Sequence, residues 1–462
     1  MNRMGEKYLC SCFKGVAWLL LFLLLVRVIL FLDSEGSAFP HWDEWRFQND
    51  ASFIQTIFAL NNENFQVFTN ALYWLAPRVG FPFWGLRYVS LLLLLAAMLV
   101  LYQVLQKNVA DNRRWLLILA FCPCFSAYMC GNLLWSGLSQ AWLYFLFIFG
   151  AVKLGFSGTN TPMRQAEMFV LIGAAFLAMN ISLPLLFALL YGARACYLKE
   201  KLPQEIFYGD ILVVGATLAA AVWLYWVVRS HDDTEFSFMT LLTADYWLWL
   251  SYALVGVWSG FWISPQETWF YYLGGGVMIL GLGLLFCRQV RCLNTHCTWA
   301  VALILLGGIA MITLYRGEAM LAVGGHAVRH IVYGVFLIPI IYTLGANDKN
   351  RYIRLLADGW LVFVLICQLP ALVRLQMSDG IPFTQFGDAC FMHYLNLEKT
   401  YAPFTCGRYQ QDVREPYRYF VTTDAAFRQA YQKGKVQSYL IPYHFEGTVF
   451  YKIPGKKLLS FR

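Results

Sequence analysis

The stretch VAWLLLFLLLVRVILFL, from Val16 to Leu32, decides the fold class of this chain. A helix needs roughly 20 apolar residues to cross the hydrocarbon core of a bilayer. This run is almost that long, and runs of similar character recur up to residue 374. Helices satisfy every backbone hydrogen bond within their own segment, as lipid requires. The sequence therefore predicts an all-α protein that crosses the membrane many times.

The overall composition supports the same fold class. Hydrophobic residues occupy 59% of the 462 positions and charged residues only 13%, whereas soluble domains have about 25% charged residues. So few charges exclude a soluble globular protein. The formal net charge of +8 lies mostly in short loops between apolar runs. That distribution is typical of the positive-inside rule and unlike a basic nucleic-acid surface.

The first apolar run follows a basic head, as the apolar part of a signal peptide does. However, the run is long, contains Arg27, and leads into Asp33-Ser34-Glu35-Gly36 without a clear small-x-small cleavage site. We therefore expect an uncleaved first span with the N-terminus in the cytoplasm. An internal salt bridge is the expected role of Arg27, because a charge within a span needs a partner.

The basic residues of the short loops set the direction of each span and predict about eleven spans in all. A polar break at 180–184 divides one long apolar stretch into two short helices that meet at an outward-facing turn. The segment from Tyr246 to Ile263 is rich in Trp and Tyr and is predicted to lie flat or re-enter from the outer side, which keeps Arg288 and Arg291 inside. The predicted spans are 16–32, 84–106, 115–130, 139–154, two within 168–195, 210–228, 269–287, 298–315, 321–344 and 353–374.

These spans divide the chain into two predicted parts. Residues 1–375 form the transmembrane domain, with a long first extracytoplasmic loop at 33–83. Residues 376–462 are polar and aromatic, and we expect a small α+β domain outside the membrane. Its Cys390 and Cys406 are able to form a disulfide if the domain is periplasmic. The remaining cysteines, such as those of Cys122-Pro123-Cys124, have the spacing of packing residues rather than of a zinc site.

The first loop carries an acidic cluster between aromatic residues. It reads His41-Trp42-Asp43-Glu44-Trp45-Arg46 and is followed by Asn61-Asn62-Glu63-Asn64. Paired carboxylates can accept a proton from a sugar hydroxyl while aromatic rings stack on the sugar. The alternative is solvated loop acids beside tryptophans that anchor at the interface. The length of this loop and its position between two spans favour a site.

A second charged cluster lies at the outer start of the predicted span 321–344. It comprises Arg316-Gly317-Glu318, His326 and Arg329-His330. A guanidinium inside a span is costly unless it has a partner, so a phosphate or carboxylate is expected at Arg329. The alternatives are snorkelling to the interface or an ion pair with Glu318. Weaker polar candidates, each with a structural alternative, are Asn132, Trp135 and Ser182.

Acids that activate a hydroxyl, together with cations that hold a phosphate, point to one reaction class on the outer face. In glycosyl transfer from a polyprenyl-phosphate sugar, the lipid phosphate gains charge as it leaves, and fixed cations stabilise it. Such a donor enters from the bilayer, so the enzyme needs no nucleotide-binding domain. In agreement, the sequence has no G-x-G-x-x-G motif after a strand.

Four short motifs stand out in the sequence: His41 to Trp45, Asn62 to Asn64, Gly131 to Trp135, and Arg329-His330. In these motifs the chain resembles the GT-C class of polytopic glycosyltransferases. Within the class, the chain looks most like the serotype-converting O-antigen glucosyltransferases of bacteria and phages, and the likeness in architecture covers residues 1 to 375. It departs from many relatives at Asn64 and Gln66, where His and Arg are expected, and at His330, where an aromatic residue often stands.

The resemblance implies a role for each candidate residue. Asp43 would be the catalytic base, and Glu44 or Glu63 would assist it or bind a sugar or a divalent cation. Arg329, with His330 and Arg316, would hold the donor phosphate. The remaining candidates would bind the sugar or the acceptor: His41, Trp42, Trp45, Asn64, Asn132 and Trp135.

The resemblance also implies partners and a location. The donor would be a polyprenyl-phosphate sugar such as glucose, and the acceptor the O-antigen of lipopolysaccharide. A polyprenyl-phosphate sugar synthase and a flippase would supply the donor. The enzyme would lie in the bacterial inner membrane with its active site and C-terminus in the periplasm. Three alternatives remain: an O-antigen ligase or polymerase, whose active loop usually comes late; a lipid-linked sugar transporter or flippase, which predicts midplane polar residues and repeats that we do not find; and a structural scaffold.

Overall fold

In the computed structural model, most of the predicted transmembrane part of the chain is described. The described residues are 3–35, 52–58, 60–61, 64–79, 81, 85–126, 129–130, 133, 139–156, 161–179, 182–229, 241–259, 268–322, 332–373, 441–445 and 448–452.

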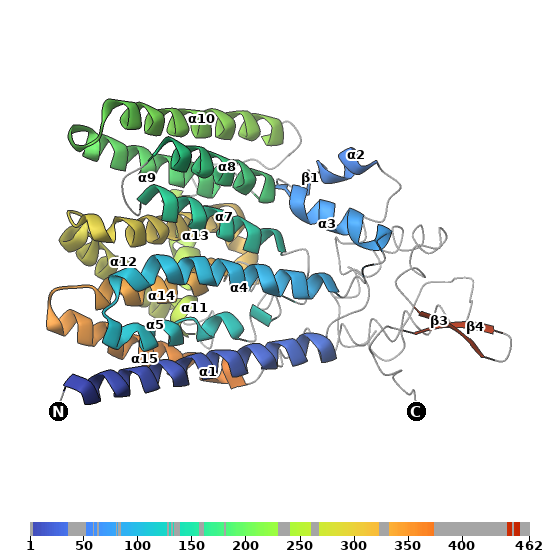
Figure 1. The fold of residues 1–462 in the computed structure, drawn as a ribbon, viewed down its shortest axis with the longest axis horizontal. Coiled ribbons are helices and arrows are strands. Elements are labelled where there is room, and N and C mark those ends of the chain that lie inside the picture. Colours follow the sequence, from blue (N-terminus) through green and yellow to red (C-terminus); the bar gives the residue numbers. More distant parts are fainter. Residues whose placement is uncertain are drawn as a thin grey trace.

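The described residues form a helical bundle, and the chain is an all-α polytopic membrane protein. Seven of the described helices are long and apolar enough to cross a bilayer. Figure 1 shows most of the long helices running along the same direction. The eleven spans of the sequence analysis remain a prediction. The helices that contain the seven apolar segments are α1 (Arg3–Glu35), α4 (Gly85–Leu105), α7 (Ser139–Phe156), α10 (Gln204–Arg229), α12 (Thr268–Gln289), α13 (His296–Ala322) and α15 (Arg351–Val373).

Three shorter helices belong to the same bundle. The predicted break at 180–184 separates α8 (Pro162–Ala178) from α9 (Ser182–Leu198). Both helices pack on α7 and on α10. The third is α14 (Val332–Ala346), which packs between α13 and α15.

Two predicted spans differ from the observed helices. Span 115–130 is not one continuous helix, because α5 (Arg114–Leu119) ends and a 3-10 turn, η4 (Cys122–Phe125), follows. Pro123 lies in that turn and has no N–H to continue an α-helix. The span predicted to begin at Leu321 is also wrong at its start, since α13 runs on to Ala322 and α14 begins only at Val332. The backbone of Arg316 is therefore helical rather than part of a loop.

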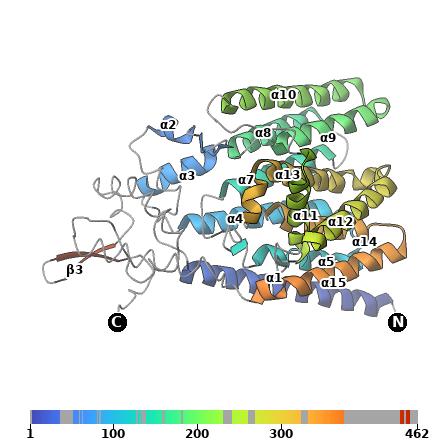
Figure 2. The same cartoon turned by 180° about the vertical axis from the view of Figure 1, so that it is seen from behind.

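The aromatic segment predicted not to span is α11 (Ala244–Ser259). It contacts α12, α13, α14 and α15, and Figure 2 shows it crossing its neighbours rather than running alongside them. Its Tyr246 hydroxyl donates to the carbonyl of Ala310, 3.3 Å away. The prediction that this segment lies flat or re-enters from the outer side remains a prediction.

The core of the bundle is centred on α7. Phe145 and Phe149 are fully buried, and each has its ring edge-on to Phe336 of α14. Peripheral helices show the reverse pattern, because α10 and α12 expose large apolar side chains along their length. Exposed apolar faces of this kind fit lipid rather than water. They include Leu212, Val222, Trp223, Trp226, Leu273, Val277, Leu280 and Leu284.

The first loop contains secondary structure of its own. Helix α2 (Phe53–Ile57) begins at Ser52, which forms a capping box with Gln55. A short antiparallel pair, β1 (Leu60–Asn61) and β2 (Asn64–Phe65), leads into α3 (Val67–Arg78). Figure 1 shows α2 and α3 at the end of the bundle where α1 ends.

The predicted C-terminal α+β domain at 376–462 is described only as a hairpin. Strand β3 (Ile441–Phe445) pairs antiparallel with β4 (Thr448–Lys452). The rest of that region, with Cys390 and Cys406, lies outside the described residues.

Candidate functional site

Most candidate residues from the sequence lie outside the described residues. For Asn64, in β2, and Arg316, in α13, the structure describes the backbone alone. It does describe the helix ends that flank all of these segments. The candidates outside the described residues are His41, Trp42, Asp43, Glu44, Trp45, Glu63, Asn132, Trp135, His326, Arg329 and His330.

These flanking helix ends lie at one end of the bundle. We call it the α3 end, and it comprises the last turn of α1 and the first turns of α3, α4, α7, α9 and α14. The loop with Asp43 follows α1, the strand with Asn64 precedes α3, and the segment with Trp135 precedes α7. His330 stands just before α14. The ends of α1, α3 and α14 therefore continue, along the chain, into segments that carry acidic or basic candidates.

A buried hydroxyl pair joins two of these segments. The Thr69 Oγ1 of α3 lies 3.0 Å from the Ser139 Oγ of α7, and both side chains are buried. Helix α2 is held against α3 as well, because the Asn70 side chain donates a hydrogen bond to the carbonyl of Ile57 at the end of α2, 3.3 Å away. The segment after Glu63 is therefore held against the segment after Trp135.

The first turns of α7 also hold α4 and α9. Trp142 donates through its indole N–H to Ser90 Oγ of α4 at 2.8 Å. The Tyr144 hydroxyl accepts the backbone N–H of Leu183 at 2.9 Å. That N–H belongs to the first turn of α9, where a helix leaves its donors without backbone partners. Ser182, a weaker candidate from the sequence, lies at the start of α9 and its side chain hydrogen-bonds with Tyr144.

The start of α14 packs against the same part of α7. The Tyr333 ring meets the Phe145 ring edge-on, with centroids 4.9 Å apart. Tyr333 is 2% exposed and follows His330 closely in the chain. The start of α14, which follows Arg329 and His330 in the sequence, therefore lies next to α7.

The sequence analysis missed a charged group at this end. Arg87 lies in the first turn of α4 and is only 2% exposed. The neighbouring Tyr88 forms a side-chain hydrogen bond with Asp33, near the end of α1, within range of the Arg87 charge. The signal was available, because Arg87 is the one cation in α4 and buried charges in spans mark sites or ion pairs.

Arg27 has a different partner from the salt bridge expected. Its guanidinium donates to the backbone carbonyls of Leu372 and Val373, at the C-terminal end of α15. The last carbonyls of a helix lack backbone donors and carry its negative partial charge. A cation from the first helix therefore caps the end of the last described helix.

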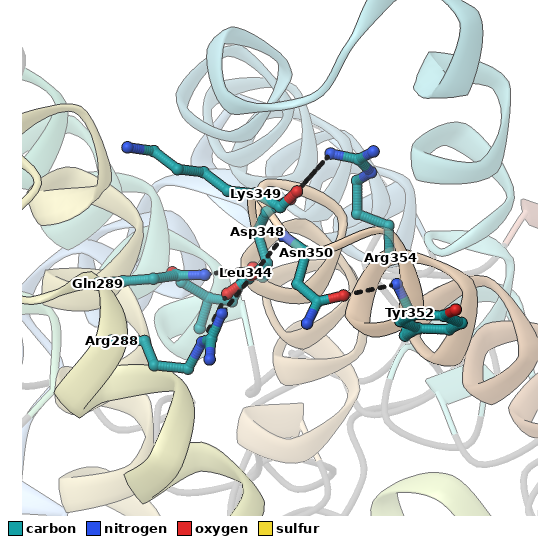
Figure 3. A network of polar contacts seen from close by, with 8 residues as sticks. All are labelled: Arg288, Gln289, Leu344, Asp348, Lys349, Asn350, Tyr352 and Arg354. Atoms are coloured by element: carbon teal, nitrogen blue, oxygen red, sulfur yellow. Dashed lines mark hydrogen bonds and ion pairs between the residues drawn. The ribbon is translucent and has the colours of Figure 1, made fainter.

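The opposite end of the bundle is fastened by a polar network around the loop Asn347–Asn350, and we call it the 347–350 end (Figure 3). Arg288 of α12 donates to both carboxylate oxygens of Asp348, at 3.3 and 3.2 Å. The backbone N–H of Asn350 donates to the same carboxylate at 2.8 Å. Burial would raise the pKa of Asp348, but the hydrogen bonds from Arg288 and Asn350 outweigh it and hold this pKa below its ordinary value.

The 347–350 end has a second ion pair between distant segments. Arg113, just before α5, contacts Asp358 of α15 at 3.2 Å, and Tyr342 of α14 reaches the same carboxylate.

A third carboxylate, Asp210 of α10, is fully buried. It accepts hydrogen bonds from Gln165 of α8, at 2.7 Å, and from Tyr191 of α9. These contacts hold helices together that are distant in the sequence.

Neither a metal site nor a known relative adds to this picture. Within the ranges that the structure describes, no group of three or more His, Cys, Asp or Glu side chains is placed to hold a metal ion. The divalent cation considered from the sequence would involve Glu44 or Glu63, which lie outside those ranges. No family model, no curated protein and no solved structure matches the chain.

Proposed function

We propose that this chain is a membrane glycosyltransferase that moves a sugar from a polyprenyl-phosphate donor to a cell-surface polysaccharide. The observation that carries the proposal is the meeting of helix ends at the α3 end. The segments with Asp43, Glu63, Trp135 and Arg329 all leave or enter the bundle there. The proposal assigns acids for a hydroxyl acceptor and cations for a phosphate to these segments, at one face of the bundle.

The distribution of charge supports an extracytoplasmic location for that face. Basic residues gather around the 347–350 end, and this asymmetry predicts that it lies in the cytoplasm. The α3 end would then face the periplasm of a bacterial inner membrane. The basic residues at the 347–350 end include Lys107, Arg113, Arg114, Lys153, Arg164, Arg194, Lys199, Lys201, Arg288, Arg291, Lys349, Arg351 and Arg354.

The proposed reaction is a displacement at the anomeric carbon of the donor sugar. Asp43 takes the proton of an acceptor hydroxyl while the hydroxyl oxygen bonds to that carbon. The bond from the carbon to the phosphate oxygen breaks, and its electron pair leaves on the lipid phosphate. Arg329 and His330, with Arg316, stabilise the phosphate as its charge grows. Glu44 and Glu63 bind the sugar or assist Asp43.

The lipid-facing surface fits a donor that arrives through the bilayer. The polyprenyl chain is apolar, and exposed apolar side chains cover α10 and α12. Glucose as the sugar and O-antigen as the acceptor are the most specific form of the proposal, and they rest on the sequence resemblance. The product would be a modified O-antigen, as in serotype conversion.

The test is transfer by membranes that contain the protein and a labelled polyprenyl-phosphate glucose. We expect label on lipopolysaccharide with the unchanged chain and none with Asp43→Asn, because the amide cannot accept the proton. Asp50→Asn, in the same loop, is the matched control and should retain transfer. Full transfer by Asp43→Asn would contradict the proposed role of this carboxylate. Growth of the lipid-linked chain, or label that crosses the bilayer without transfer, would favour a polymerase or a flippase.

A further inference from the structure

Tyr333, in the first turn of α14, has a hydroxyl that forms no hydrogen bond with the described residues. The side chain is buried, and its Oη has no hydrogen-bond partner among the described residues. A buried polar atom without a partner destabilises the fold, so proteins rarely keep one without a reason. The Tyr333 hydroxyl is therefore a candidate to bind a group other than the described residues.

The position of the Tyr333 ring is tightly defined. Phe145 meets it edge-on, with centroids 4.9 Å apart. On the α13 side, a Cβ on Gly308 would come within 2.8 Å of the ring, closer than real contacts allow. Gly308 thus leaves space for the ring.

Other buried tyrosines show that this bundle can satisfy a phenol where its role is structural. Tyr144 accepts from the Leu183 N–H, and Tyr191 donates to Asp210. Tyr342, on the same helix as Tyr333, reaches the Arg113 carbonyl and the Asp358 carboxylate. Tyr246 donates to the Ala310 carbonyl. Tyr333 departs from this pattern at the end of α14 that follows Arg329 and His330.

Two further buried polar atoms lie on the helices that contact Tyr333. Gln140 Oε1, in the first turn of α7, and Thr313 Oγ1, towards the same end of α13, also lack partners among the described residues. Gln140 precedes Tyr144 by one helical turn, so the two share a face of α7. Three helices of this part of the bundle thus each carry a buried polar atom without a partner among the described residues.

We infer that the Tyr333 hydroxyl binds the lipid-linked donor by donating a hydrogen bond to an oxygen of its phosphate. This inference rests on the proposed function and adds a donor-binding residue to it. A phenol donating to an anionic phosphate oxygen makes a charge-assisted hydrogen bond, which is stronger than a neutral one. Binding of the donor would give the Tyr333 hydroxyl a partner that the described residues do not provide.

The test is Tyr333→Phe in the full-length protein, with transfer and thermal unfolding both measured. Loss of a charge-assisted hydrogen bond should lower kcat/KM for the donor roughly 10- to 100-fold. Inhibition by polyprenyl phosphate without sugar should weaken by a similar factor, which identifies the phosphate rather than the sugar as the contact. The unfolding temperature should stay equal or rise, because the variant removes an unsatisfied buried group.

Tyr342→Phe is the matched control on the same helix. It removes a hydroxyl with structural partners at the 347–350 end, so it should lower the unfolding temperature and leave kcat/KM unchanged. If Tyr333→Phe transfers as the wild type does, or loses transfer only in step with stability, the inference is overturned while the proposed function stands. If the wild type transfers no sugar from any polyprenyl-phosphate donor, the proposed function fails and the inference fails with it. If Tyr333→Phe has a lower kcat/KM for the donor but is inhibited by polyprenyl phosphate as strongly as the wild type, the proposed contact with the phosphate is also overturned.

Discussion

The hydroxyl of Thr69 lies 3.0 Å from the hydroxyl of Ser139 in the buried contact between α3 and α7. This pair joins the loop segment after Glu63 to the segment after Trp135, which are far apart in the sequence. It is the most direct described link between two of the candidate segments. Its contribution to stability and to transfer is therefore a measure of how the proposed site is held together.

Thr69→Val and Ser139→Ala each remove one partner of this pair. We expect each variant to lower the free energy of unfolding by about 1 kcal/mol and to reduce transfer, since the acidic loop is then less firmly held. The double variant should lose less free energy of unfolding than the two single variants lose together. A double-mutant cycle in detergent measures this difference. A coupling energy of zero would show that the two hydroxyls do not interact.

Asp210→Asn should destabilise the protein without abolishing transfer per folded molecule. Its carboxylate is fully buried and accepts hydrogen bonds from Gln165 and Tyr191. Loss of a buried charged acceptor costs about 2 kcal/mol or more, and thermal unfolding measures it. Asp245→Asn, an exposed carboxylate at the start of α11, is the control and should have a much smaller effect. Equal effects of the two variants would contradict this structural role of Asp210.

Acid should destabilise the 347–350 end by protonating Asp348. The pKa of this carboxyl is lowered in the folded state, because the hydrogen bonds from Arg288 and Asn350 outweigh the effect of burial. A lowered pKa means that its stabilisation is present above the ordinary value of 3.8 and is lost as the pH falls through the folded value. The unfolding temperature, followed from pH 6 downwards, should fall less steeply in Asp348→Asn than in the wild type. Identical pH profiles would exclude Asp348 as a contributor.

Arg27→Met should weaken the contact between the first and the last described helix of the bundle. The methionine keeps the apolar stem but cannot donate to the carbonyls of Leu372 and Val373. We expect a loss of roughly 1–3 kcal/mol in the free energy of unfolding. Hydrogen exchange should become faster at the end of α15 but not at its beginning, near Arg351. Lys14→Met, on the same helix but near its other end, should leave exchange at the end of α15 unchanged.

The orientation of the chain is testable by labelling single cysteines in a variant without the native ones. We expect a cysteine at Asn347 to react only from the cytoplasmic side and one at Ser378 only from the outer side, as the positive-inside rule predicts. Ser378 labelled from the cytoplasm would contradict the predicted span count and the location of the C-terminus. Labelling at Asn347 from the outer side would show that the bundle has the opposite orientation in the membrane.

The sequence by itself determined that the chain lies in a membrane and where most of its helices lie. Runs such as Val16 to Leu32 must be helical in lipid, because each backbone N–H needs a partner within its own segment. The break between α8 and α9 and the basic character of the loop near Asp348 were predictable for the same local reasons. The interruption at Pro123 was also open to prediction, since a proline removes one backbone donor.

Only the tertiary structure decided which helix ends meet and what surrounds each polar group. Arg27 was expected to pair with an acid, yet it caps the end of α15, because packing brings α15's last carbonyls beside α1. In the same way, the burial of Arg87 and of Tyr333 depends on neighbours that are distant in the sequence. A long apolar run specifies that a helix forms, but contacts between helices depend on side-chain shapes that no local pattern encodes.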